Sequence, residues 1–120
     1  MNASTIFALS TGSNRAAIAI IRISGPRARD VIGRMCLVDP DPRVATLSKI
    51  LHPRSKVILD VGLVLLFPGN SSATGEDCVE LHIHGSRAVI SAILAGLNEL
   101  EDFRPATPGE FTDRKSTRLN

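Results

Sequence analysis

The sequence predicts one α+β domain in which helices pack on one side of a mixed β-sheet. Its 120 residues are enough for one compact domain with a core of its own and too few for two ordinary domains. The content of 43% hydrophobic and 22% charged residues is typical of a globular chain. Periodicity then gives the order of elements: strand, strand, helix, long apolar strand, polar-faced strand, helix.

The first two strands are predicted at residues 5–9 and 16–24, which are rich in β-branched and apolar side chains. The turn-forming residues TGSN at 11–14 separate them, so we expect a hairpin. Gly25 and Pro26 end the second strand, and proline is favoured in the first turn of a helix.

A short helix should follow. Its core-facing side chains recur at helical spacing and are Ala28, Val31, Ile32 and Met35. Residues 37–56 are richer in proline and charge and read as a loop, with one short element at 44–51. Residues 57–67 are almost continuously apolar, which is expected of a strand covered on both faces.

Residues 78–84, CVELHIH, alternate strictly in polarity. A strand here would point Cys78, Glu80, His82 and His84 to one side and its aliphatic side chains to the other. Gly85 and Ser86 open a second helix, whose apolar stripe is Ile90, Ile93, Leu94 and Leu97. Gly96 within it weakens the helix by roughly 1 kcal/mol unless packing offsets the loss. Thr107 and Pro108 resemble another helix start.

Charge and leader sequence limit the function classes. The formal charge is +2, but Arg114, Lys115 and Arg118 lie at the end, and without them 11 basic residues face 12 acidic ones. The body of the domain therefore offers no evident surface for nucleic acid phosphates. No apolar run is long enough to span a bilayer, and no secretory or transit leader is visible. We therefore expect a cytoplasmic protein.

Metal binding and thiol catalysis are both disfavoured by strand geometry. His82 and His84 could reach one ion, but Cys78 would lie about 13 Å from His82 along an extended strand. Cys78 has no adjacent base and several acidic neighbours, so it is a poor nucleophile. We interpret Cys36 and Cys78 as small buried hydrophobic residues. The sequence also lacks a phosphate-binding loop motif and a nucleophile elbow, so we assign no catalytic and no metal-binding residue.

Two charged residues in otherwise apolar strands are the candidate binding residues. Arg22 shares a strand face with Ile18 and Ile20 and precedes a helix start, where a guanidinium can bind a carboxylate or carbonyl. Glu80 can accept two parallel N–H donors, the pair that an amino-substituted heterocycle presents. The alternatives are a structural ion pair between the two residues and an exposed sheet face.

Three stretches carry a family resemblance: TIFALSTGSNRAAIAIIRISGP at 5–26, FPGNSSATGEDCVELHIHG at 67–85 and RPATPGEFTDR at 104–114. In order and spacing they resemble the N-terminal domain of the MnmE/TrmE tRNA-modification GTPases. The resemblance extends over nearly the whole chain to Arg114. The IIRISG, GED and PGEFT-R elements are specific in combination and weak individually.

The resemblance implies a domain that binds a tetrahydrofolate one-carbon carrier, of the formyl or methylene type, and forms a homodimer. It implies that Arg22 and Glu80 match folate-contacting positions. In the family a helical domain and an inserted GTPase domain follow, so GTP, Mg²⁺ and K⁺ would enter only through domains absent from this chain. With a flavin-dependent partner subunit, the full protein modifies the wobble uridine of certain tRNAs. A homodimer without a working ligand site remains the alternative.

The end of the chain departs from the family pattern. After PGEFT-R the family continues with a helix start and a segment whose lysine contributes to the folate site, whereas residues 115–120 here read KSTRLN. We therefore expect the family domain over residues 1–114. Residues 115–120 are expected to be a foreign tail that reflects truncation or an artefact.

Overall fold

The computed structural model describes residues 4–10, 17–69, 72 and 74–119. In chain order these residues form β1 (Thr5–Leu9), β2 (Ile18–Ser24), α1 (Asp30–Met35), β3 (Thr46–Leu51), β4 (Ile58–Phe67), β5 (Cys78–His84), α2 (Arg87–Asn98), β6 (Phe103–Pro105) and α3 (Glu110–Leu119). The predicted turn at 11–14 lies outside the described residues.

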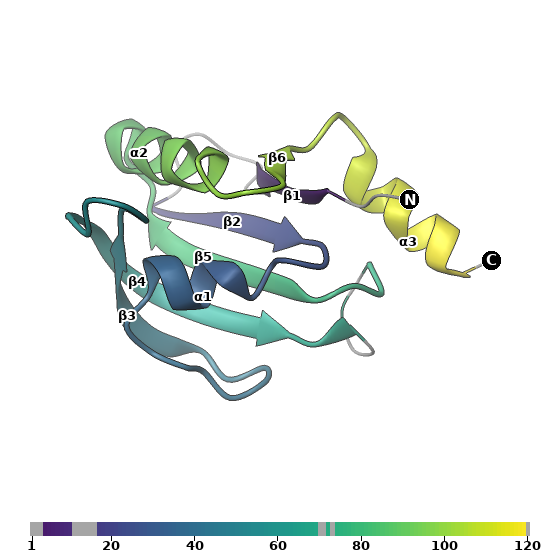
Figure 1. Cartoon of the computed structure of the whole chain (residues 1–120), viewed down its shortest axis with the longest axis horizontal. Coiled ribbons are helices and arrows are strands. Elements are labelled where there is room, and N and C mark those ends of the chain that lie inside the picture. The colour runs from purple at the N-terminus through teal and green to yellow at the C-terminus, as the bar shows by residue number, and fades with distance from the viewer. Residues whose placement is uncertain (1–3, 11–16, 70–71, 73, 120) are drawn as a thin grey trace.

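The strands form one six-stranded sheet in the order β3-β4-β5-β2-β1-β6. Neighbouring strands are antiparallel except β1 and β6, which are parallel, so the sheet is mixed. Helices α1 and α2 lie against one face of it (Figure 1). The predicted α+β fold, with helices on one side of a mixed sheet, is confirmed.

The core lies between that face and the two helices. All four predicted side chains of the first helix are buried, as are Ile93 and Leu97 of α2. Ser86 caps α2 by accepting a hydrogen bond from the N–H of Val89 at 3.2 Å, as the sequence predicts. A Cβ at Gly96 would approach both Met35 and Pro53 to 3.1 Å, so the glycine allows α2 to pack closely against these residues.

Two details differ from the sequence-based expectation, and the structure gives the expected short element its type. Pro26 begins a run of turns rather than the helix, and α1 starts only at Asp30. The backbone N–H groups that first make i to i−3 hydrogen bonds are those of Ala28, Asp30, Val31 and Ile32. The short element at 44–51 is an edge strand, β3. Strand β6 is not predicted, because three residues ending in proline carry no periodic signal.

The prediction that residues 57–67 are covered on both faces is wrong. Val64 and Leu66 of β4 are buried in the core, but Val61 and Leu63 point the other way and are exposed. An apolar run shows that a strand avoids water and does not show what covers each face. We call the side of the sheet opposite α1 and α2 the outer face.

Candidate functional site

The candidate site lies on the outer face, where the two central strands β2 and β5 meet. Arg22 and Glu80 are directly opposite in the β2–β5 register, so their side chains leave the sheet on the same side. Ala8 of β1 flanks Arg22, and Leu65 of β4 flanks Glu80. The sheet thus brings together the two residues that the sequence singles out.

Both oxygens of the Glu80 carboxylate are engaged in the ligand-free chain. Arg22 donates to Oε2 from Nε at 3.1 Å, and its Nη2 lies 3.0 Å from the same oxygen. His82 Nε2 lies 3.0 Å from Oε1. Because an ionised carboxylate only accepts hydrogen bonds, Nε2 of His82 carries the hydrogen. The structural ion pair considered from the sequence is therefore present.

The Arg22–Glu80 pair marks a boundary in solvent exposure. The side chain of Glu80 is 16% exposed and that of Arg22 38% exposed. Two residues further along the strands, and on the same face, Ser24 pairs with Cys78, and both are buried. In the other direction Ile18 pairs with His84, and both are exposed. The carboxylate is largely shielded and remains reachable from one side.

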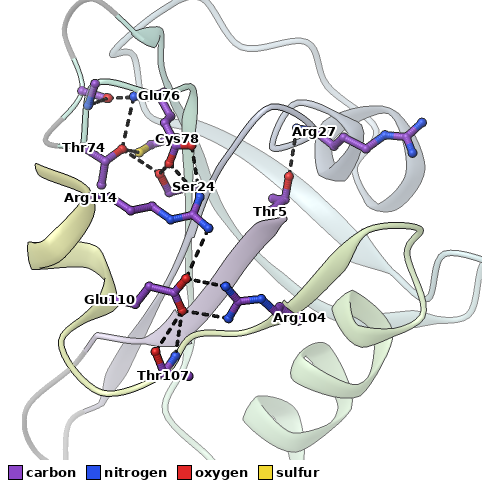
Figure 2. A network of polar contacts seen from close by, with 12 residues as sticks. Thr5, Ser24, Arg27, Thr74, Glu76, Cys78, Arg104, Thr107, Glu110 and Arg114 are labelled. Atoms are coloured by element: carbon purple, nitrogen blue, oxygen red, sulfur yellow. Dashed lines mark hydrogen bonds and ion pairs between the residues drawn. The ribbon is translucent and has the colours of Figure 1, made fainter. Parts of the chain in front are cut away.

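The buried end is covered by a polar network that joins α3 to the loop before β5 (Figure 2). Glu110 accepts from Arg104 Nη1 at 2.8 Å and from Arg114 Nη2 at 3.3 Å. Arg114 Nη1 also reaches Glu76 at 2.9 Å, and Glu76 accepts from Ser24 Oγ at 3.0 Å. This chain of alternating charges fixes the first turn of α3 against the sheet.

Hydrogen bonds set the charge state of this network. Those from Arg104 and from the Thr107 backbone, opposed by partial burial, lower the pKa of Glu110 to about 2. The same contact with Glu110 raises the pKa of Arg104. Both groups are therefore fully ionised over the physiological range.

Two other histidines are paired with carboxylates. His84 contacts Asp60 through Nδ1 at 2.8 Å, and its backbone N–H donates to the other oxygen at 2.8 Å. Burial acts to raise the pKa of Asp60, but these hydrogen bonds outweigh it and the pKa is lowered. His52 contacts Glu99 at 3.1 Å, and this hydrogen bond lowers the pKa of Glu99. Among the described residues, no three His, Cys, Asp or Glu side chains are arranged to hold a metal ion.

The cysteines are buried, as predicted. Burial raises the pKa of the Cys36 thiol to about 12, so it stays protonated and is not a nucleophile. The Cys78 sulfur lies 3.3 Å from the Thr74 hydroxyl.

Two surface hollows lie away from the Arg22–Glu80 pair. One, of about 480 Å³, is lined by α1, residues 37–39 and Leu66. The other, of about 330 Å³, lies between β1 and α2. Neither includes Arg22 or Glu80 in its lining. Among the described helices, none is both long and apolar enough to cross a membrane.

Sequence reasoning missed two features of the site. It weighed His82 only as a metal ligand and did not foresee its contact with Glu80, although their i, i+2 spacing on a strand allows it. It also did not foresee the contact between Arg114 and Glu76, which are 38 residues apart. The PGEFT-R element contains both Glu110 and Arg114, so it was the part of the sequence that could have indicated this network.

The comparisons with known proteins all indicate the same family. Residues 5–118 match the family described as GTP-binding protein TrmE N-terminus. A tRNA modification GTPase MnmE of Beijerinckia indica subsp. indica is 51% identical over 110 residues, which are 92% of this chain and 24% of the relative. The corresponding protein of Sinorhizobium medicae is 54% identical, with 92% of this chain and 25% of the relative covered.

A relative in Danio rerio is named 5-taurinomethyluridine-[tRNA] synthase subunit GTPB3, mitochondrial. It is 50% identical over 110 residues, with 92% of this chain and 22% of the relative covered. The chain thus spans about a quarter of the length of the curated relatives it matches. The matched residues contain β1 to β6 and the whole Arg22–Glu80 site. The chain therefore belongs to the family of the TrmE N-terminal domain.

Proposed function

We propose that this chain is the tetrahydrofolate-binding and homodimerising domain of a tRNA wobble-uridine-modifying GTPase. The ligand would be a formyl- or methylene-type tetrahydrofolate, held by Arg22 and Glu80. The observation that supports this most directly is a shielded carboxylate and a guanidinium side by side on an open sheet face.

Glu80 suits the pterin ring chemically. A carboxylate accepts two parallel N–H donors, and the ring presents an amino group beside a ring N–H. In the ligand-free chain Arg22 and His82 take up these acceptor positions. Binding would therefore exchange the contacts of Arg22 with Glu80 for contacts with the ring, and Arg22 could then donate to the ring carbonyl.

Calorimetric titration of the purified chain with 5-formyltetrahydrofolate tests the ligand. We expect Glu80→Ala to weaken binding at least tenfold, because a hydrogen bond to a charged group is worth about 1.5–3 kcal/mol. Glu101→Gln is the matched control, since this carboxylate is 81% exposed and its contact to Arg27 lies away from the site. No heat with folded wild-type protein, or unchanged binding by Glu80→Ala, would contradict the proposal.

Homodimerisation is supported by the exposed aliphatic side chains of the outer face. Leu47 of β3 pairs with Leu63 of β4, and Val61 lies one same-face step further along β4. A patch of this kind on a sheet without helices is typical of an interaction surface.

A dimerisation module without ligand binding is the second candidate function. It is favoured by the complete pairing of Glu80 within the chain, which leaves no oxygen in need of a ligand. Sedimentation at several concentrations, with and without 5-formyltetrahydrofolate, distinguishes the two candidate functions. If the chain is a dimerisation module only, the folate should not change its monomer–dimer equilibrium.

The remaining assignments concern the longer protein. We propose a cytoplasmic location, a flavin-dependent partner subunit and tRNA as partners, and no membrane association. GTP, Mg²⁺ and K⁺ would act through domains outside this chain. We also propose that the folate-binding domain comprises residues 1–114 and that residues 115–120 are foreign to it. Restoring the family's lysine segment in their place should then strengthen folate binding in the same titration.

A further inference from the structure

We propose that α3 is a releasable strap over the end of the outer face where Cys78 is buried. The strap is held to the rest of the domain by the ion pair between Arg114 and Glu76. When this pair opens, α3 moves away and residues 74–76 lift, which uncovers the Cys78 thiol. The release needs no ligand, so it goes beyond the proposed function.

Helix α3 is fixed by charged side chains rather than by apolar packing. Of the α3 side chains that the structure describes, those of residues 110–114, none belongs to the hydrophobic core. Phe111 is the one apolar residue among these five, and it is only half-buried. The side chain of Arg114, by contrast, is 17% exposed, and its Nη1 donates to the two oxygens of Glu76 at 2.9 Å and 3.1 Å. The position of α3 therefore depends on ion pairs.

The two ends of this ion-pair network have different roles. Glu110, in the first turn of α3, accepts from Arg104 at 2.8 Å and from the backbone N–H of Thr107 at 2.9 Å, so its partners lie just before it in the chain. Arg114 lies one turn later and reaches Glu76, which is 38 residues away. Breaking the contact between Arg114 and Glu76 therefore frees the later part of α3, while Glu110 still holds the first turn.

Glu76 connects the strap to the cover over Cys78 (Figure 2). Ser24 Oγ donates to the Glu76 carboxylate at 3.0 Å and lies 2.7 Å from the Thr74 hydroxyl. The same hydroxyl accepts from the backbone N–H of Glu76 at 3.3 Å and lies 3.3 Å from Cys78 Sγ. Thr74 and Cys78 are each 3% exposed. The thiol is thus covered by a segment that Arg114 holds in place.

Loss of the Arg114 charge should favour the open state. The side chain of Glu76 is 27% exposed, and without the guanidinium it would be a partly shielded carboxylate with a neutral hydroxyl as donor. Such a carboxylate is unfavourable, and lifting residues 74–76 into water removes the cost. Because Thr74 belongs to the lifted segment, Ser24 and Cys78 lose their cover at the same time. Salt at about 1 M, which shortens the screening length to about 3 Å, should act in the same direction.

The labelling rate of Cys78 by N-ethylmaleimide measures the opening. The folded chain contains two buried thiols, and proteolytic peptides analysed by mass spectrometry report them separately. We expect Arg114→Gln to accelerate labelling of Cys78 about tenfold or more, the effect of losing hydrogen bonds between charged groups. Cys36 is the internal control, because it lies at the end of α1 and should react at the wild-type rate.

Two further variants separate the charge from a general loss of stability. Arg114→Lys keeps a positive charge within reach of Glu76 and should restore most of the protection of Cys78. Arg87→Gln removes an exposed arginine from the first turn of α2 and should change neither thiol. In wild type, about 1 M NaCl should accelerate labelling of Cys78 and not of Cys36, and this salt effect should be lost in Arg114→Gln.

An unchanged Cys78 rate in Arg114→Gln would overturn the strap. Equal acceleration of both thiols would also overturn it, because the variant would then open the whole domain. If Arg114→Gln does not fold, wild type alone decides: selective acceleration of Cys78 by salt supports the strap, and the absence of a selective effect contradicts it.

Discussion

At the scale of single residues, the two charged side chains at the centre of the sheet, Arg22 and Glu80, are paired with each other. Glu80 is mostly shielded, and an unpaired carboxylate in that position would cost several kcal/mol. Arg22 satisfies one of its oxygens and His82 the other. The direction of the carboxylate is thus fixed before any ligand arrives, which reduces the ordering that binding would require.

His82 should act on folate binding through Glu80. Removing its donor in His82→Leu leaves Oε1 free to rotate, and we expect 5-formyltetrahydrofolate binding to weaken about tenfold. His82→Gln keeps a donor at the corresponding position and should restore most of the affinity. Calorimetric titration of both variants with 5-formyltetrahydrofolate measures these affinities. Equal losses in the two would show that the imidazole ring itself, rather than its hydrogen bond, is needed.

Glu110 should make the domain sensitive to acid. Its pKa is about 2 in the folded chain, against an ordinary value of 4.5, so its ion pairs stabilise the fold above about pH 4.5. This stabilisation is lost as the pH falls from 4.5 toward 2. Arg104 is partly exposed, and solvent weakens its ion pair with Glu110. We therefore expect Glu110 to contribute on the order of 2 kcal/mol to the free energy of unfolding, which is less than its full pKa shift would give.

Urea unfolding of wild type and Glu110→Gln between pH 7 and pH 2.5 measures this contribution. The variant should be less stable at pH 7 and should approach the wild type at the acid end. Asp113→Asn is the control, since Asp113 lies on the same helix and is exposed. A constant gap between wild type and Glu110→Gln at every pH would contradict the ionisation argument.

At the scale of elements, the turn from β2 into α1 holds the candidate site in place. Gly25 has a φ of +147°, and a Cβ there would lie 2.6 Å from the Cα of Thr5 in β1. The N–H of Arg27 donates to the Thr5 hydroxyl at 2.9 Å, so the turn is also tied to β1 by a hydrogen bond. The close approach of two backbones therefore explains the glycine after IIRIS.

Gly25→Ala should destabilise the domain by about 2 kcal/mol or more, through backbone strain and the clash with Thr5. Gly33→Ala is a matched control in α1, because a Cβ there meets nothing within 4 Å. It should stabilise the helix by roughly 0.5–1 kcal/mol. Thermal unfolding of both variants measures the two effects. A mild loss in Gly25→Ala, similar in size to a surface substitution, would mean that the turn can relax.

At the scale of the whole molecule, the domain is a sheet with helices on one face (Figure 1). The other face carries the Arg22–Glu80 pair and several exposed aliphatic side chains. The sequence predicts the helix-covered side well, because the period of its apolar residues reports which side chains avoid water. It predicts the outer face poorly. Val61 and Leu63 belong to the same apolar run as the buried Val64, and nothing local distinguishes an exposed face from a covered one.

The candidate site likewise has features that the local pattern predicts and features that it does not. Alternation along 78–84 is enough to place Glu80 and His82 on one face, and this prediction is confirmed. The pairing of Asp60 with His84 and of Glu76 with Arg114 joins residues that are distant in sequence. Those contacts depend on how the strands are ordered in the sheet, which periodicity does not encode.

The outer face also gives the last prediction, that two copies of the chain associate through Leu47 and Leu63. Leu47 is 65% exposed and forms a cross-strand pair with Leu63, so either position can accept a charge without disturbing the core. A stable dimer buries about 800 Å² on each copy and excludes water from its centre. A carboxylate placed there would lose its hydration and meet its own copy across the two-fold axis.

Leu47→Glu and Leu63→Glu should therefore each weaken the dimer by at least about 3 kcal/mol, roughly a hundredfold in the dissociation constant. Sedimentation equilibrium measures this, with Leu37→Glu as a control of equal charge and similar exposure on the helix-covered side. The folded monomer should keep its far-UV circular dichroism, because neither leucine contributes to the core. A dimer that survives both outer-face charges and dissociates with Leu37→Glu would move the interface to the other side of the sheet, beside α1.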